Sequence, residues 1–170
     1  VDSLVGSEMC IRDRYRGMTI AEAAKIRGES PEEAIVNLII EDGSRIQCIY
    51  FSMSEDNVRK KIMLPWVSFD SDAGSYSDIS KDFITHPRAF GSFARVLGKY
   101  VREEKLITME EAIRRLSGFP AENLGIKKRG YLKTGFFADV VVFDPKIIED
   151  KATFEKPLQF AVGVEDVFVN

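Results

Sequence analysis

The sequence is poor in the side chains that most often build metal sites and disulfides. It holds one histidine, His86, and two cysteines among its 170 residues. A catalytic zinc site uses about three protein ligands, commonly His, Cys or a carboxylate. The chain therefore cannot supply a histidine-rich metal site alone. Two cysteines imply no disulfide framework, and Cys48, in an apolar stretch, is expected in the core.

Long apolar runs and an excess of positive charge are also absent. No run approaches the roughly 18 apolar residues of a transmembrane helix, and the N-terminus lacks the apolar region of a signal peptide. A net charge of -3 leaves no basic footprint for nucleic acid. An apolar content of 45% with 30% charged residues is ordinary for a globular protein. We therefore expect a cytoplasmic protein that binds neither nucleic acid nor membranes.

Capping patterns predict where the helices begin. Thr19 with Glu22 forms a capping box, and Gly28 can end the helix that follows. Similar start signals recur along the chain, once with proline at the first helical position. The expected helices are 20–27, one from Ser30 with Ala34, Leu38 and Ile39 buried, 54–63, 87–103, 108–116 and 120–125.

Valine, isoleucine and aromatic residues concentrate in the segments that we expect to be strands. The expected strands are 46–51, 66–69, a stretch of strand periodicity from 130 to 144, and 162–169. The first two are separated by a helix. In one parallel sheet such a β-α-β unit requires a right-handed crossover.

Asp72 is the most informative position, because the predicted strand from Trp66 to Phe69 delivers it into a long polar loop. The loop spans residues 70–85 and ends at His86-Pro87-Arg88, which opens a helix. A (β/α)8 barrel presents its catalytic groups in this way, at the carboxyl ends of its strands. Local sequence alone leaves a turn or helix-capping aspartate as the alternative, with Asp70 as a competing acid.

The segment from Ser71 through Arg88 to Glu103, with Gly-Ser-Phe-Ala-Arg-Val-Leu-Gly at 91–98, resembles the N-acyl-D-amino-acid deacylases (D-aminoacylases) of the metal-dependent amidohydrolase superfamily. That family has Ser-Asp-Gly after barrel strand 8, followed by His-Pro-Arg and a helix. Ala73 departs from the pattern, where the family usually has glycine. The run from 130 to 144 is similar to the return of an amidohydrolase chain into its small β-sandwich.

The resemblance implies an α/β fold. Residues 15–125 would be the last βα units of a (β/α)8 barrel with a catalytic loop at 70–85, and residues 126–170 would be strands of the β-sandwich. It also implies a zinc-dependent hydrolase of the amide bond in N-acyl-D-amino acids, with a small molecule as its partner. Apart from Asp72, the zinc ligands would lie outside this chain, so the isolated chain is expected to be inactive.

The resemblance assigns roles to particular residues. Asp72 would be general base and then general acid on a metal-activated water, with a possible contact to the metal. Arg88 would hold the substrate carboxylate through two parallel hydrogen bonds, and Ser71 would contact substrate. His86 is either a helix-start residue that orders the loop or a metal ligand.

Two other functions stay open. A cyclic-amide hydrolase, such as a dihydroorotase or hydantoinase, also uses an aspartate at strand 8. A barrel that lacks metal ligands would instead be a structural or interaction protein. The ligands that decide between catalysis and this last function are expected upstream of Tyr15.

The segment Ser3-Leu4-Val5-Gly6-Ser7-Glu8-Met9-Cys10-Ile11-Arg12-Asp13-Arg14 resembles the in-frame translation of a transposase sequencing adapter. Such segments are excluded from fold reasoning. We therefore expect residues 1–14 to be non-native, with a natural N-terminal strand or tail as the alternative. The gene is then expected to be truncated within a domain, and the C-terminus is expected to be cut as well.

Overall fold

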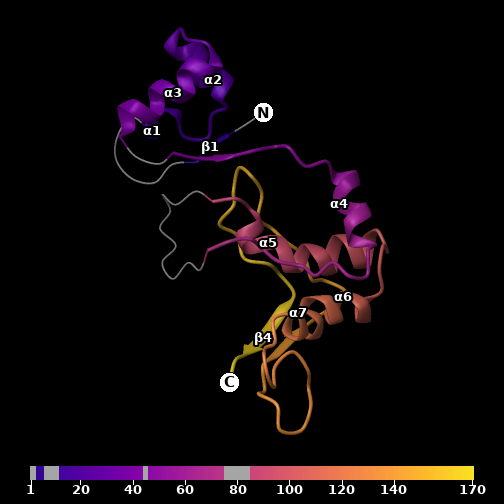
Figure 1. Cartoon of the computed structure of the whole chain (residues 1–170). Coiled ribbons are helices and arrows are strands. Elements are labelled where there is room, and N and C mark those ends of the chain that lie inside the picture. The colour runs from indigo at the N-terminus through magenta and orange to yellow at the C-terminus, as the bar shows by residue number, and fades with distance from the viewer. Residues whose placement is uncertain (1–2, 6–11, 44–45, 75–84) are drawn as a thin grey trace. The chain divides into compact units, whose positions relative to one another are not determined.

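The computed structural model describes residues 3–5, 12–43, 46–74 and 85–170. These residues divide into two compact units. Unit 1 contains the described residues up to Met53 together with Thr85 and His86, and unit 2 contains residues 54–74 and 87–170. The chain is shown in Figure 1, coloured from its N-terminus to its C-terminus.

Unit 1 is built around a helical hairpin. Helices α2 (Ile20–Arg27) and α3 (Pro31–Asp42) pack against each other, and both begin with a complete capping box. Short strands β1 (Ser3–Val5) and β2 (Gln47–Ile49) pair antiparallel, and α1 (Arg12–Tyr15) precedes the hairpin. The buried cluster of this unit is Tyr15, Ala23 and Leu38, with Met18, Ile20, Ile46 and Cys48 packed around it.

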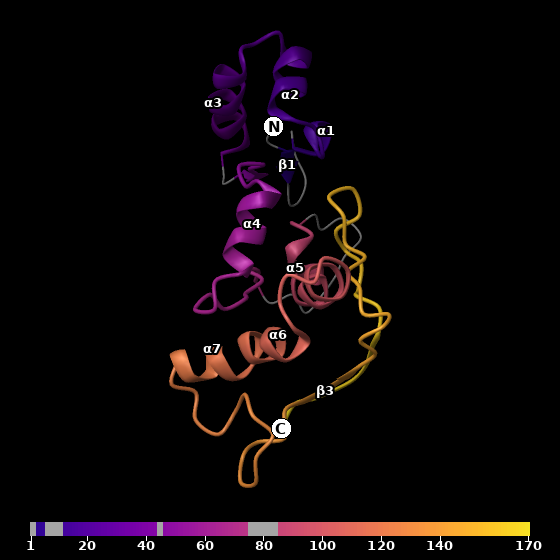
Figure 2. The same ribbon diagram turned by 90° about the vertical axis from the view of Figure 1, so that its right-hand side faces the viewer.

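Unit 2 is organised around one long helix, which starts as α5 (Arg88–Arg95) and continues as the π-helix η1 (Val96–Glu103). Helix α4 (Glu55–Ile62) precedes it, and α6 (Met109–Leu116) and α7 (Gly118–Asn123) follow. Strands β3 (Val140–Phe143) and β4 (Val164–Phe168) form an antiparallel ribbon, visible in Figure 2. The core is Ala94, Val96, Leu97, Val101, Ala112 and Ile148.

The structure confirms most of the predicted helices. Thr19, Ser30, Ser54 and Thr108 each accept the hydrogen bond expected of a helix N-cap. The helix predicted at 87–103 is continuous, although its second half takes the wider π spacing, as in the hydrogen bond from Glu104 N–H to Lys99 O. Ile39 was wrongly placed in the buried stripe of α3, because its side chain is half exposed.

The strand predictions are confirmed near the C-terminus and wrong in the middle. Residues 66–69 form no strand, and no strand begins in the predicted stretch 130–144 before residue 140. The predicted strand 46–51 shortens to β2. It pairs antiparallel with β1 instead of joining a β-α-β unit. Every strand pair among the described residues is antiparallel. The mixture of helices and strands agrees with the expected α/β content, while the parallel barrel and the β-sandwich stay predictions.

The main chain of residues 62–69 finds partners other than a neighbouring strand. Val67 N–H donates to Leu64 O within a turn, at 3.2 Å, and Phe69 N–H donates to the main-chain oxygen of Arg115, at 3.5 Å. The carbonyls of Ile62 and Val67 accept hydrogen bonds from the Arg115 side chain. A segment becomes a strand only when a neighbouring strand hydrogen-bonds to it. The local apolar pattern of residues 66–69 does not show whether such a neighbour exists.

Two glycines of the long helix bring it close to the chain segment 148–152. A Cβ built on Gly98 would lie 2.6 Å from Ile148 O, and one on Gly91 would lie 3.1 Å from the Cβ of Asp150. The first contact is with main chain, which cannot swing away. The second is with a side chain, which can shift by a few tenths of an ångström. Gly98 therefore sets the approach of helix and segment more strictly than Gly91.

We predict that Gly98→Ala lowers the free energy of unfolding by about 1–3 kcal/mol, because the new methyl group overpacks a main-chain contact. Gly91→Ala is the matched control. Alanine is about 1 kcal/mol better than glycine inside a helix, so this variant should be neutral or slightly stabilising. Urea unfolding of both variants measures the difference. Equal losses in the two would contradict the packing described here.

Candidate active site

The candidate site lies just after residues 62–69, the segment whose carbonyls bind the Arg115 side chain. Asp72 has a φ of 47°, in the left-handed region that aspartate tolerates better than most residues. Its neighbour Asp70 is used locally, since its Oδ1 accepts a hydrogen bond of 2.7 Å from the Ser71 N–H. The two candidate acids therefore differ in environment. The Asp70 carboxylate is occupied by a main-chain hydrogen bond, whereas 82% of the Asp72 side chain is exposed.

Asp72 forms an ion pair with Arg88. Nη1 of Arg88 lies 3.0 Å from Oδ2 of Asp72. Arg88 is the first residue of α5, so the carboxylate lies near the end of the helix whose N–H groups carry partial positive charge. Two residues selected from the same motif, one for proton transfer and one for carboxylate binding, are thus in direct contact.

The Asp72–Arg88 pair contributes little to stability by itself. Side-chain exposures of 82% and 46% leave both groups in a high dielectric, where such pairs are worth about 0–1 kcal/mol. The surrounding structure must therefore determine where the two groups lie. Arg88 is placed by the contacts that attach the long helix to α4.

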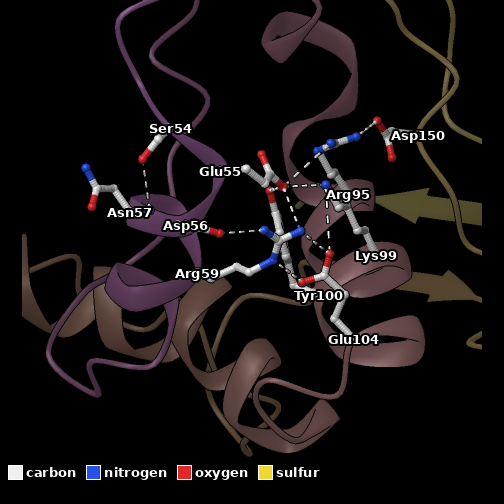
Figure 3. Close-up of polar contacts among 10 residues, drawn as sticks. All are labelled: Ser54, Glu55, Asp56, Asn57, Arg59, Arg95, Lys99, Tyr100, Glu104 and Asp150. Atoms are coloured by element: carbon white, nitrogen blue, oxygen red, sulfur yellow. Dashed lines mark hydrogen bonds and ion pairs between the residues drawn. The ribbon is translucent and has the colours of Figure 1, made fainter.

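A network of charged residues joins α4 to the long helix, as Figure 3 shows. Glu55 lies at its centre, where it accepts a 2.8 Å hydrogen bond from Tyr100 OH and pairs with Lys99. Arg59 donates two hydrogen bonds to Glu104, at 2.8 and 3.0 Å. These contacts link residues that are far apart in the sequence, and they attach the helix that begins at Arg88 to α4.

The same network extends to the segment after β3. Arg95 Nη1 lies 3.1 Å from Oδ2 of Asp150, and Arg95 Nη2 lies 4.0 Å from Oε1 of Glu55. One face of the long helix thus carries cations between acids on two other segments. Because the acids approach from both sides, the helix has little freedom to rotate about its axis.

The pKa of Glu55 reflects this environment. Burial alone would raise the pKa, but hydrogen bonds from Lys99 and Tyr100 outweigh it, and the net pKa lies below the ordinary value of 4.5. The hydrogen bond from Arg59 likewise lowers the pKa of Glu104. A depressed carboxylate pKa means that the folded state binds a proton less readily than the unfolded state. Its stabilising contribution is therefore complete above about pH 4.5 and is lost as the pH falls through the lowered value.

We predict that Glu55→Gln reduces stability at neutral pH and flattens its dependence on pH. The wild-type protein should lose stability between pH 5 and pH 3, about the range in which carboxylates protonate. The variant should lose less over the same range, and Glu104 should account for part of the dependence that remains. Urea midpoints across this range measure the effect, and parallel curves would show that Glu55 contributes nothing to it.

The remaining sequence predictions divide by where their residues lie. Ser71 is adjacent to Asp72 and half-buried. Cys48 packs at the edge of the unit 1 cluster, as expected of a core residue. His86 belongs to unit 1, and its role stays a prediction. The described residues bring no three His, Cys, Asp or Glu side chains together as a metal site would require.

Sequence reasoning missed Glu55 and Arg115. Glu55 had no distinguishing signal beyond its place in the first turn of a helix. Arg115 had one, because it lies one turn after Ala112 in the helix Met109–Leu116 and so shares the face that α6 buries. A charged residue on the buried face of a helix indicates a specific partner.

Comparison with known proteins gives the family. No protein-family model matches the chain. The D-aminoacylase of Alcaligenes xylosoxydans xylosoxydans is 36% identical over 154 residues, which are 91% of this chain and 30% of that protein. The chain is a relative of the D-aminoacylases of the amidohydrolase family. It spans about a third of the length of the relatives it matches.

A solved structure supports the same relationship. The crystal structure of the N-acyl-D-glutamate deacylase of Bordetella bronchiseptica, in complex with zinc and a phosphonate that mimics the tetrahedral intermediate, matches with a TM-score of 0.86 and 36% identity. The match covers 99% of this chain and 33% of that one. A more distant relative is the dihydroorotase of Lactobacillus acidophilus, 36% identical over 77 residues, which are 45% of this chain and 17% of that protein.

Proposed function

We propose that the complete protein is a zinc-dependent amidohydrolase of the N-acyl-D-amino-acid deacylase type. It would hydrolyse an N-acyl-D-amino acid to a carboxylate and a free D-amino acid. The observation that supports this most directly is the contact between Asp72 and Arg88. It places a proton-transfer group beside a carboxylate-binding group in a chain related to D-aminoacylases.

Arg88 would bind the free α-carboxylate of the substrate. A guanidinium can make two parallel hydrogen bonds to a carboxylate, which fixes orientation as well as charge. In the structure the Arg88 guanidinium already pairs with one carboxylate, that of Asp72. Binding there would hold the amide at a fixed distance from the acid, and Ser71 would contact the substrate from the same turn.

Asp72 would move the proton. As general base its carboxylate accepts a proton from the hydrolytic water, while the water oxygen forms a bond to the amide carbon. As general acid it then donates that proton to the amide nitrogen, and the carbon–nitrogen bond breaks to release the amine. The exposed position of Asp72 leaves it accessible to both water and substrate.

Zinc belongs to this proposal, although the described residues do not assemble a site for it. The ion would lower the pKa of the hydrolytic water when it is bound. Asp72 is the residue of this chain that we assign a contact with it. The other ligands would come from parts of the protein outside the residues described here.

The proposal includes the architecture that the resemblance implies. Residues 15–125 would complete a (β/α)8 barrel, with the loop at 70–85 on its catalytic face, and residues 126–170 would add strands to a β-sandwich. The antiparallel ribbon of β3 and β4 supports the second assignment. The substrate would be a small molecule, with no role for nucleic acid or membrane, and the compartment would be the cytoplasm. No helix among the described residues is long and apolar enough to cross a membrane.

We predict that Asp72→Asn removes most turnover in the complete protein, by a factor of about 10²–10⁴, which is typical for a general acid–base group. Asparagine preserves the shape but cannot accept the proton. The fold should be unchanged, because the exposed ion pair contributes little stability. Asp70→Asn is the matched control and should retain turnover. Initial rates of amine release measure both, and near-wild-type activity of Asp72→Asn would refute its assignment.

We predict that Arg88→Ala mainly raises KM for carboxylate-bearing substrates. The loss should be about tenfold to a hundredfold, the range for a charged hydrogen-bonded partner. A substrate in which the carboxylate is replaced by an uncharged amide is the control, because the positive charge of Arg88 attracts a neutral amide much less strongly. Steady-state kinetics with both substrates separate binding from structural damage. Equal losses on the two would argue against carboxylate recognition.

The second candidate function is hydrolysis of a cyclic amide. The similarity to a dihydroorotase over 45% of the chain favours it. Rates with N-acyl-D-amino acids and with dihydroorotate or a hydantoin distinguish the two candidates. Turnover of the ring substrates alone would replace the deacylase proposal, and turnover of neither class in the metal-loaded protein would favour a non-catalytic barrel.

A further inference from the structure

Arg115 is fully buried, with 0% of its surface exposed. The two hydrogen bonds made by its side chain go to main-chain carbonyls. Nε donates to Val67 O at 2.5 Å, and Nη1 donates to Ile62 O at 2.6 Å. Burial lowers the pKa of Arg115 from its ordinary value, which reflects the cost of placing a cation there. A buried cation in a native protein calls for a reason, because its desolvation is costly.

The contacts of Arg115 converge on one short segment. Its guanidinium carbon lies 4.4 Å from the centre of the Phe69 ring, and its own carbonyl accepts a 3.5 Å hydrogen bond from the Phe69 N–H. A guanidinium is planar and rigid, so its two hydrogen bonds fix the two carbonyls relative to each other as well as to α6. One residue therefore holds the chain at Ile62, Val67 and Phe69.

The segment held in this way leads directly to the candidate base. Phe69 is three residues before Asp72, and its ring packs against the core cluster that contains Leu97 and Val101 of the long helix. The same helix begins at Arg88. The main chain thus leads from Asp72 back to Phe69, which packs against the core cluster of the helix that carries Arg88, and Arg115 holds this segment.

Arg114 adds a weaker contact to the same segment. Its Nη2 donates to Pro65 O at 2.9 Å, but the side chain also binds Glu111 on its own helix and is 39% exposed. Arg114 therefore has a partner that does not depend on the segment. Arg115 has its hydrogen bonds to the segment alone, and its Nη2 is buried without a partner.

We propose that Arg115 is a positioning residue for Asp72. It would act through the segment 62–69, whose place it determines, and would not touch substrate. The inference rests on the proposed function of Asp72 as the proton-transfer group. It goes further by identifying the residue that places this group relative to Arg88.

The test compares Arg115→Met with Arg102→Met in the complete protein. Methionine removes the guanidinium while it keeps much of the apolar stem. Arg102 is a matched control, because it also donates to a main-chain carbonyl, that of Ile148, from the long helix. Its hydrogen bonds do not involve the segment 62–69. Both variants lose an arginine–carbonyl contact in unit 2, but only one loses it beside Asp72.

Hydrogen exchange of peptides from 62–72 and steady-state kinetics are measured on both variants. In Arg115→Met we expect exchange at 62–72 to accelerate by about tenfold or more. We expect kcat to fall by a similar factor while KM changes little, because Arg88 stays in place. Arg102→Met should leave exchange at 62–72 and kcat near the wild-type values. Unchanged exchange at 62–72 in Arg115→Met, or equal kcat losses in both variants, would overturn the inference.

A second variant keeps the test decisive if Arg115→Met does not fold. Arg115→Lys retains the charge but cannot present two fixed donors to two carbonyls. It should show the same local acceleration and loss of kcat to a smaller degree, and wild-type values for both would overturn the inference. A failure of the proposed function would give a different result from a failure of the Arg115 inference. If Asp72→Asn keeps its turnover, the deacylase assignment fails, while exchange at 62–72 still reports whether Arg115 holds the segment.

Discussion

Two hydrogen bonds from the buried guanidinium of Arg115 to main-chain carbonyls determine where the candidate acid, Asp72, lies. Arg115 fixes Ile62 and Val67, and through Phe69 it ties the same segment to the core. The Asp72–Arg88 pair is too exposed to organise itself, because solvent screens most of its attraction. Contacts elsewhere in unit 2 therefore determine where the two groups lie.

The partner of Asp72 is placed by different means. Arg88 begins a helix that is fixed to the segment 148–152 by close approach at Gly98 and to α4 by the network around Glu55. Both attachments lie farther along the helix than Arg88, whose side chain is 46% exposed and pairs with Asp72. A helix held in this way suits a residue that must bind a carboxylate in a fixed place and release it after reaction.

How much the sequence could predict depends on the range of the interactions involved. The helix starts at Thr19 and Ser30 were predictable, because each capping box is completed by a residue within the next turn. The strand expected at 66–69 was not observed, and the carbonyl of Val67 binds an arginine far along the chain instead of a neighbouring strand. Asp72 and Arg88 could be selected from their motif, but Arg115 could not be connected to them without the fold. Pairing across long sequence separations carries no local signature.

If the complete protein hydrolyses N-acyl-D-amino acids, as we propose, the stereochemistry of hydrolysis is the first property to measure. The zinc-loaded complete protein would be incubated with matched N-acetyl-D- and N-acetyl-L-amino acids, and free amine would be quantified for each. We expect amine release from D-substrates in clear preference to their L-counterparts. Release from neither enantiomer, or preferential release from the L-substrates, would contradict it.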